Sequence, residues 1–182
     1  MRCLLLSLAF VPIMVQQGTP TVCYRPIAKV TPKIEVRQEK CLATMIYGEA
    51  RGESLKGQIA VAYTAMNRAV KQTICKVVLS PKQYSIFNDN PALRAAAMSL
   101  HLEPKQKSTI DKTSWKQALQ VAKSVMRKEV ADPTNGATHY LAPTLMKAKR
   151  YKYPLWSKQY RLAVVIDNHR FYKLVDRPTT KS

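Results

Sequence analysis

Residues 46–54 read Ile46-Tyr47-Gly48-Glu49-Ala50-Arg51-Gly52-Glu53-Ser54 and separate two amphipathic patterns. Before this stretch, Leu42, Met45 and Ile46 recur at helical spacing, and Glu49 continues the same row. A carboxyl group held against apolar side chains loses hydration, which favours the protonated form that a general acid needs. Glu49 is therefore the first candidate for chemistry.

Glu53 follows on the same side of the predicted helix as Glu49. From that position it is able to accept hydrogen bonds or to tune Glu49 through its charge. The alternative is that both glutamates are solvated, pair with Arg51 or Lys56, and only help to open the next helix. The spacing alone leaves both interpretations open.

The chain has 182 residues, of which 46% are hydrophobic, so it is long enough for one domain with a real core. Lys and Arg number 30 against 11 Asp and Glu, which gives a net charge of +19. A charge of this size predicts an anionic partner. Nucleic acid, bacterial wall polymers and acidic lipid surfaces all qualify.

The N-terminus has one basic residue followed by an apolar run, Cys3 to Val15, that is shorter than a membrane span. We expect residues 1–17 to be an export signal, or an N-terminal anchor if it is not cleaved. Prolines make residues 18–37 an expected linker. A folded domain at 38–176 and a tail at 177–182 complete the expected organisation.

Cys41 and Cys75 lie inside the expected domain, whereas Cys3 and Cys23 precede it. If the protein is exported, Cys41 and Cys75 are candidates for a disulfide, because oxidising compartments permit such bonds. The alternative is two buried thiols that act as small apolar side chains. The sequence has no Cys-x-x-Cys motif or clustered His and Cys spacing, so we expect neither a metal nor another cofactor.

Helical periodicity predicts several helices, and turn-forming residues separate them from weaker strand patterns. The expected helices are 38–51, 55–70 with Ser54 as N-cap, 91–102, and one that reaches 129 with Thr113 or Ser114 as N-cap. Residues 73–84 are interpreted as a connector and 132–136 as a turn. The expected strands are 137–141, 162–166 and 169–175, the last two paired across Asp167 and Asn168.

Residues 147–161, called here the basic segment, interleave cations with aromatic rings. They hold Lys147, Lys149, Arg150, Lys152, Lys158 and Arg161 beside Tyr151, Tyr153, Trp156 and Tyr160. This pattern is typical of single-stranded nucleic-acid sites, so a nucleic-acid-binding module is one interpretation. The expected export signal argues against it, and the same cations would attract anionic wall polymers or a membrane surface. A solvated face without a partner is the third alternative.

Several short blocks occur in one order along residues 39–172, and together they resemble the SleB-type cell-wall hydrolases, the spore cortex-lytic family also found in bacteriophages. The blocks are Tyr47-Gly48-Glu49-Ala50-Arg51-Gly52-Glu53, Gly57-Gln58-Ile59-Ala60-Val61-Ala62, Asn67-Arg68, Cys75-Lys76-Val77-Val78, Gln83-Tyr84-Ser85, Gly136-Ala137-Thr138-His139-Tyr140, Pro154-Leu155-Trp156 and Asn168-His169-Arg170-Phe171-Tyr172. The chain departs from the family at Asp167, where glycine is usual, and at Tyr84, where phenylalanine is frequent.

The resemblance implies a lysozyme-like single domain of the α+β class, mainly helical with a small antiparallel sheet. It also implies a lytic transglycosylase that cleaves peptidoglycan glycan strands between N-acetylmuramic acid and N-acetylglucosamine, in phage lysis or wall remodelling. Glu49 matches the family's catalytic glutamate, and one carboxyl group is able to act first as acid and then as base. A hydrolytic muramidase is the alternative enzyme. A nucleic-acid-binding or wall-binding module without catalysis is the alternative from another class.

Ordinary glycosidases use two carboxylates that face each other across the sugar. Because Glu53 would project from the same side of an intact helix as Glu49, we expect it to support the reaction rather than share it. The other residues assigned to support or substrate binding are Tyr47, Arg51, Asn67, Thr138, His139, Tyr140 and Trp156. We expect a monomer that acts in the periplasm, the wall or the medium, without a nucleic-acid partner.

Overall fold

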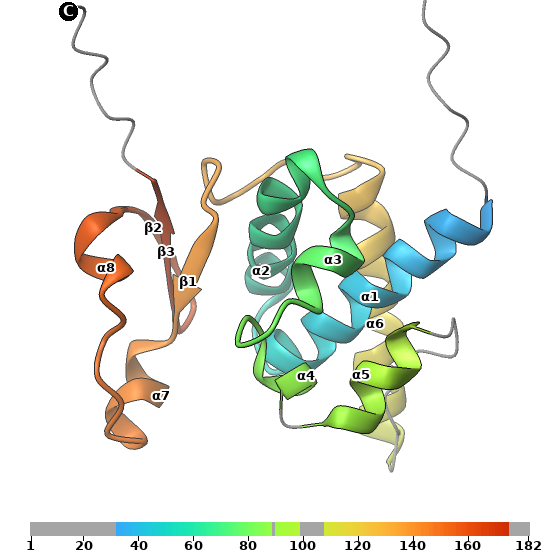
Figure 1. The fold of residues 1–182 in the computed structure, drawn as a ribbon, viewed down its shortest axis with the longest axis horizontal. Helices are drawn as coiled ribbons and strands as arrows, with labels where there is room; N and C mark the ends of the chain where they lie inside the picture. The colour runs from blue at the N-terminus through green and yellow to red at the C-terminus, as the bar shows by residue number, and fades with distance from the viewer. Residues whose placement is uncertain (1–31, 89, 99–107, 175–182) are drawn as a thin grey trace, which may run out of the picture.

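The computed structural model describes residues 32–88, 90–98 and 108–174. Figure 1 shows a body of helices with a small sheet and two short helices beside it. The expected export signal at 1–17 and the tail at 177–182 lie outside the described residues. In the part of the chain that the structure describes, no helix is both long and apolar enough to cross a membrane.

One helix runs through the middle of the body and forms the centre of the core. This helix, α1 (Pro32–Ala50), is buried at every residue from 41 to 47, because other helices surround it. The sequence suggested a one-sided apolar stripe, whereas residues 41–47 are buried on all sides of the helix. The predicted start at Gln38 was also too late. Pro32 begins the helix, where its missing N–H has no helical partner to lose, so residues 32–37 are helix rather than linker.

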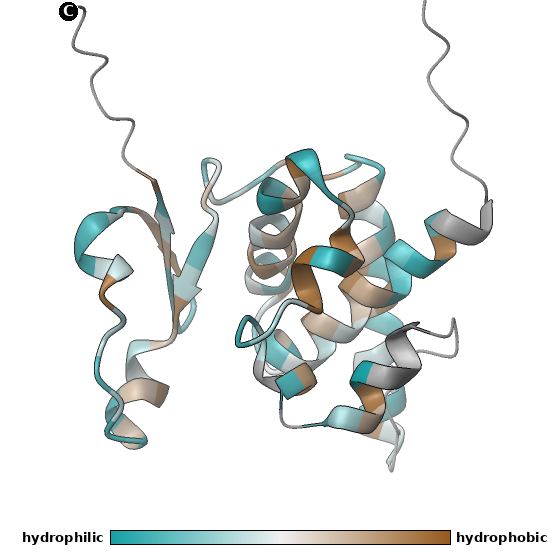
Figure 2. Ribbon diagram, viewed as in Figure 1, coloured by the Kyte–Doolittle hydropathy of each residue, from teal (hydrophilic) through white to brown (hydrophobic). Residues whose placement is uncertain are grey.

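The remaining helices of the body pack around α1, and Figure 2 shows hydrophobic residues concentrated where the helices meet. In chain order they are α2 (Leu55–Arg68), a 3₁₀ turn (Ala69–Lys71), α3 (Ile74–Val78), α4 (Ser85–Asn88), α5 (Pro91–Met98) and α6 (Thr109–Met126). Ser54 caps α2 as predicted, by accepting a hydrogen bond from the Gly57 N–H. The connector predicted at 73–84 was wrong, because it contains α3, which is too short for a periodic signal.

The start of α6 also differs from the prediction. Ser108 caps this helix by accepting a hydrogen bond from the Asp111 N–H, so the helix begins before Thr113 and Ser114. The Thr113 hydroxyl lies inside the helix and donates to the Thr109 carbonyl oxygen. The predicted end of the third helix, at 102, lies outside the described residues.

The sheet has three antiparallel strands in the order β1-β3-β2, so the last strand lies between the other two. The elements of this lobe are β1 (His139–Leu141), α7 (Pro143–Ala148), α8 (Trp156–Gln159), β2 (Arg161–Ile166) and β3 (His169–Lys173). Tyr140 pairs with Phe171, and Ile166 pairs with His169 across the predicted turn. The three strands and the fold class, mainly helical with a small antiparallel sheet, are confirmed.

A disulfide joins Cys41 in α1 to Cys75 in α3, with an S–S distance of 2.09 Å. It resolves the choice that the sequence left open between a bridge and two buried thiols. The Gln38 side-chain oxygen also accepts a hydrogen bond from the Cys75 N–H, at 2.9 Å. The bridge therefore fastens α3, a helix of five residues, to the central helix.

We predict that removing this bridge lowers the free energy of unfolding by about 3 to 4 kcal/mol, because the loop it closes spans a sequence separation of 34. Urea unfolding of wild type and of a Cys41→Ala/Cys75→Ala variant measures the difference. A reductant should destabilise the wild type and leave the double variant unchanged. Equal stability of the oxidised wild type and the variant would contradict the prediction.

Candidate active site

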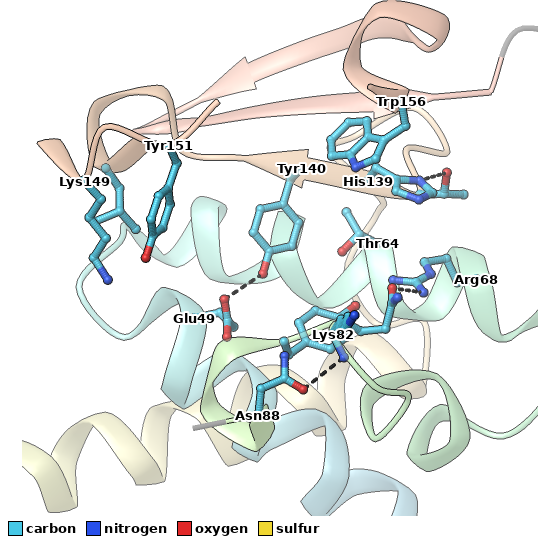
Figure 3. A pocket seen from close by; sticks show the side chains of 14 residues that line it. Glu49, Thr64, Arg68, Lys82, Asn88, His139, Tyr140, Lys149, Tyr151 and Trp156 are labelled. Carbon is cyan, nitrogen blue, oxygen red and sulfur yellow. Dashed lines mark hydrogen bonds between the residues drawn. The ribbon is translucent and has the colours of Figure 1, made fainter. Parts of the chain in front are cut away.

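A cleft of about 580 Å³ lies between the helical body and the sheet lobe. Figure 3 shows Tyr140, His139 and Trp156 reaching into it from the sheet lobe, opposite Glu49 and Arg68 from the helices. The described residues that line it are Glu49, Thr64, Arg68, Lys82, Gln83, Tyr84, Asn88, Thr138, His139, Tyr140, Leu145, Lys149, Tyr151 and Trp156. Five of the predicted site residues, Glu49, Thr138, His139, Tyr140 and Trp156, are therefore brought together.

Glu49 lies one residue before the end of α1, is half-buried, and receives donors from both walls of the cleft. The Ile86 N–H points to Oε1 at 3.3 Å, and the Tyr140 hydroxyl points to Oε2 at 3.4 Å. The neighbouring Gly48 makes the first contact possible. A Cβ built on Gly48 would lie 2.3 Å from the Ile86 side chain, so a larger residue would push α4 away from Glu49.

Tyr140 is held as a hydrogen-bond donor. Burial, followed by the nearby charge of Glu49, raises the pKa of the Tyr140 hydroxyl well above its ordinary value. The hydroxyl therefore keeps its proton at neutral pH and stabilises the ionised form of Glu49. The ring is fixed from behind by His169 and Phe171, with centroid distances of 5.1 and 5.9 Å.

Aromatic rings gather at the end of the cleft near Arg68. The Trp156 ring lies 5.0 Å from the His139 ring, 5.8 Å from Tyr160 and 5.5 Å from Tyr172, measured between centroids. The Thr138 hydroxyl lies 2.9 Å from Nδ1 of His139 and fixes the orientation of the imidazole. This end of the cleft offers ring faces and edges that suit the apolar face of a sugar.

His139 is neutral at neutral pH. Burial, followed by the positive charge of Arg68, lowers the pKa of its imidazole below the ordinary value. Burial also lowers the pKa of His169, against the charges of Glu53, Glu49 and Asp167. Because the lowered pKa values make both imidazoles harder to protonate in the folded protein than in the unfolded chain, the folded state loses stability as the pH falls.

Asn67 lies outside the cleft and anchors the sheet lobe to α2. Its side-chain amide donates to Asp132 Oδ2 and to the Ala137 carbonyl oxygen, both at 2.9 Å. Asp132 also accepts hydrogen bonds from the N–H groups of Thr134 and Gly136, which closes the predicted turn. Among the residues assigned to support or substrate binding, Asn67 therefore holds the segment before β1 against α2 and does not line the cleft.

Glu53 does not lie on α1, because that helix ends at Ala50 and Glu53 follows in the turn. Glu49 and Glu53 therefore do not share an intact helix, contrary to the prediction. Glu53 instead accepts hydrogen bonds from the N–H and the side-chain amide of Asn168, at 3.4 Å each, and its Oε1 lies 3.9 Å from Nδ1 of His169. These contacts tie the turn between β2 and β3 to the turn between α1 and α2.

Two further predicted residues also lie away from the cleft. Tyr47 is buried in the core, where its hydroxyl donates to Asp111 at 3.0 Å and its ring meets Trp115 edge to face. Arg51 is exposed, and its guanidinium lies 5.0 Å from the centroid of the Tyr47 ring. A residue's place beside Glu49 in sequence therefore does not place it in the cleft, because neighbours on a helix point to different sides.

The sequence interpretation did not single out several lining residues as site residues: Thr64, Arg68, Lys82, Gln83, Tyr84, Asn88, Leu145, Lys149 and Tyr151. Signals for some of them were present. Arg68, Gln83 and Tyr84 belong to blocks that carried the family resemblance, and Lys149 and Tyr151 belong to the basic segment. Among the described residues, no group of His, Cys, Asp and Glu is able to hold a metal ion.

Comparison with known proteins gives a family and a fold. The model of the Cell Wall Hydrolase family matches residues 52–172. Among solved structures, the catalytic domain of the germination-specific lytic transglycosylase SleB from Bacillus anthracis is 21% identical, with 75% of this chain and 94% of that chain covered and a TM-score of 0.53. The catalytic domain of the Bacillus cereus SleB protein is 22% identical, covering 75% and 90%, with a TM-score of 0.48. No curated protein matches.

At these identities the likeness to solved structures concerns the fold, which agrees with the helical body and three-stranded sheet described above. The family match begins at Gly52, so Glu49 lies outside the matched range. The importance of Glu49 therefore rests on its geometry: a carboxylate in the cleft, held between donors from the two walls.

We predict that Arg68→Gln raises the pKa of His139 part of the way to its ordinary value, because burial remains when the charge is removed. Titration of the imidazole signals by NMR measures this shift. Arg68→Lys keeps the positive charge and should keep the low pKa. His169, whose pKa has no contribution from Arg68, is the internal control. An unmoved His139, or equal movement of both histidines, would contradict the prediction.

Proposed function

Because the chain belongs to the cell wall hydrolase family, we propose that it is a lytic transglycosylase that cleaves peptidoglycan between N-acetylmuramic acid and N-acetylglucosamine. Glu49 is its catalytic acid and base. The observation that carries the proposal is the position of Glu49 in the cleft, where donors from the helical body and from the sheet lobe meet its two oxygens. Membership of the family makes the protein a peptidoglycan-cleaving enzyme.

The reaction requires one carboxyl group that changes its protonation state. Protonated Glu49 gives its proton to the glycosidic oxygen as the bond to the muramoyl C1 breaks through an oxocarbenium-like state. Ionised Glu49 then takes the proton of the muramoyl 6-hydroxyl, whose oxygen attacks C1 and closes an anhydro ring. Glu49 ends protonated again, so no water is consumed. The Tyr140 hydroxyl and the Ile86 N–H stabilise the carboxylate between the two steps.

The contacts of Glu53 support the single-acid route. A two-carboxylate glycosidase needs its second carboxylate across the sugar from the first. Glu53 instead faces Asn168 and His169, and Glu49 is the only carboxylate among the described residues that line the cleft. We assign Glu53 to holding the sheet lobe in place. Trp156 and His139 then offer the surface on which a sugar ring stacks.

We predict that Glu49→Gln lowers the cleavage rate by at least about 10² to 10⁴-fold, because the amide neither gives nor takes the proton. Digestion of purified peptidoglycan, followed by mass spectrometry of the products, measures both the rate and the chemistry. The wild type should release anhydro-muramoyl ends. Glu35→Gln, which neutralises an exposed glutamate on the same helix, is the control and should keep the wild-type rate.

Different outcomes separate the alternatives. Reducing muramoyl ends without anhydro sugar would identify a hydrolytic muramidase that keeps Glu49 but uses water. Undiminished wall clearing by Glu49→Gln would remove Glu49 from the reaction. Circular dichroism of the variant must match that of the wild type, so that a loss of rate reports chemistry rather than unfolding.

We further propose that the protein is exported and acts as a monomer in phage lysis or wall remodelling. The disulfide between Cys41 and Cys75 supports export, because such bonds persist in oxidising compartments. The basic segment would attract anionic wall polymers or a membrane surface in the same setting. Its cations Lys147, Lys149, Arg150, Lys152, Lys158 and Arg161 are exposed, and within the described residues none of them forms an ion pair.

We predict that a variant with Lys147, Arg150, Lys152 and Lys158 changed to Gln binds walls more weakly, because it loses charge that attracts polyanions. Cosedimentation with purified walls, in the Glu49→Gln background that leaves them intact, measures binding at about 0.1 M and about 1 M salt. The control changes Lys112, Lys116, Lys123 and Lys128 on or beside α6 to Gln, with the same loss of charge. Equal loss in both variants would mean that only net charge matters.

A further inference from the structure

The cleft that holds Glu49 is positively charged. Arg68 at the end of α2, Lys82 in the turn before α4 and Lys149 at the end of α7 all line it. Figure 3 shows Lys149 and Arg68 toward opposite ends of the cleft, with Glu49 between them. Because three separate segments supply these cations, the charge follows from how the fold assembles the cleft rather than from one basic run.

None of the three cations has an acidic partner among the described residues. The Arg68 guanidinium donates to the neutral Gln83 side chain, and Lys149 lies 5.9 Å from the centroid of the Tyr151 ring. Within the described residues, neither of these cations nor Lys82 forms a salt bridge. The charge of Arg68 already acts on other groups in the cleft, since it contributes to the lowered pKa of His139.

The turn that carries Lys82 has a defined backbone conformation. Its φ is +61°, in the left-handed region that residues other than glycine and asparagine seldom adopt. The Lys82 N–H donates to Asn88 Oδ1 at 3.0 Å, which holds the turn in that conformation. The turn therefore presents a lysine at the cleft where a glycine would satisfy the backbone more easily.

We propose that Arg68, Lys82 and Lys149 select muramoyl residues that carry a peptide stem, by binding the carboxylates of that stem. The inference rests on the proposed function and deepens it. In a strand that carries stems, the lactyl carboxyl group of each muramoyl sugar is held in an amide bond, so the sugars themselves are neutral and give no use for cations along the cleft. The peptide stem, attached through the lactyl group of the muramoyl sugar, brings free carboxylates to the sugar whose glycosidic bond Glu49 cleaves in the proposed reaction.

Position distinguishes these three cations, Lys149 of the basic segment included, from the cations that lie outside the cleft. Attraction of the whole protein to the wall requires cations on the exposed surface, wherever they lie. Such attraction acts before the substrate enters the cleft. Cations that line the cleft act on the bound substrate, and their effect is strongest where the cleft excludes water. They therefore change the choice between two substrates of equal length, which general attraction to the wall does not.

The test compares three soluble glycan-strand substrates of the same length. These are strands with intact stems, strands whose stems an amidase has removed and whose freed lactyl carboxyl groups have then been converted to amides, and strands whose stem carboxylates have been converted to amides. The wild type should cleave intact strands about tenfold faster in kcat/KM than either of the others, since each exposed ion pair contributes about 1.5-fold to fivefold. This preference should shrink between about 0.05 M and about 0.5 M salt.

Matched variants locate the effect. Arg68→Gln/Lys82→Gln/Lys149→Gln should bring the ratio of kcat/KM for intact and amidated strands close to one. Lys116→Gln/Lys123→Gln/Lys128→Gln removes the same charge away from the cleft and should keep the ratio of the wild type. If the first triple variant fails to fold, the wild type still decides between charge and size, because amidated stems keep their size.

The outcomes separate this inference from the proposed function. Equal rates of the wild type on intact and amidated strands, or faster cleavage of stripped strands, would overturn the inference and leave the transglycosylase standing. Equal loss of preference in both triple variants would also overturn it. If no substrate yields anhydro-muramoyl ends, the proposed function itself fails.

Discussion

The close approach of α4 to α1 at Gly48 is the contact on which the cleft depends. A side chain at this position would occupy the space of Ile86, whose Cβ lies 2.5 Å from the site of a Gly48 Cβ. Since Ile86 brings its N–H to Glu49, the missing side chain at Gly48 fixes one donor to the carboxylate. The turn that leads into α4 also carries Lys82 and Tyr84, so the same approach sets the helical wall of the cleft.

The opposite wall is fixed by the turn between β2 and β3, where Asp167 has a φ of +48°. This left-handed conformation explains why glycine is usual there in the family that the sequence resembles. Asp167 offsets the conformational cost with its carboxylate, which accepts hydrogen bonds from the N–H and hydroxyl of Ser54 at 3.0 and 2.6 Å. Gly57 makes room for it, because a Cβ there would lie 2.2 Å from Asp167 Oδ2.

Short-range sequence patterns were sufficient to predict the elements that carry such patterns. They were insufficient for elements and site residues whose position depends on tertiary contacts. The Ser54 cap and the strands around Asp167 follow from short-range patterns, and the structure confirms them. The short helix α3 has no periodicity of its own, because a disulfide and packing against α1 hold it. In the cleft, Lys82 was missed for a similar reason: a lysine in a turn looks like a solvated residue until the fold places the turn at the cleft that also holds Glu49.

The two glutamates of the opening stretch divide their work because α1 ends between them. Had the helix continued past Ala50, Glu53 would lie beside Glu49 and repel its ionised form, which disfavours the first half of a single-acid reaction, in which Glu49 gives up its proton. The chain instead turns, and Asn168 and His169 hold Glu53 against the sheet lobe. That lobe carries Tyr140, whose hydroxyl meets Glu49. Glu53 therefore acts on the cleft through the wall it fastens, and in the proposed reaction the proton is exchanged at Glu49 alone.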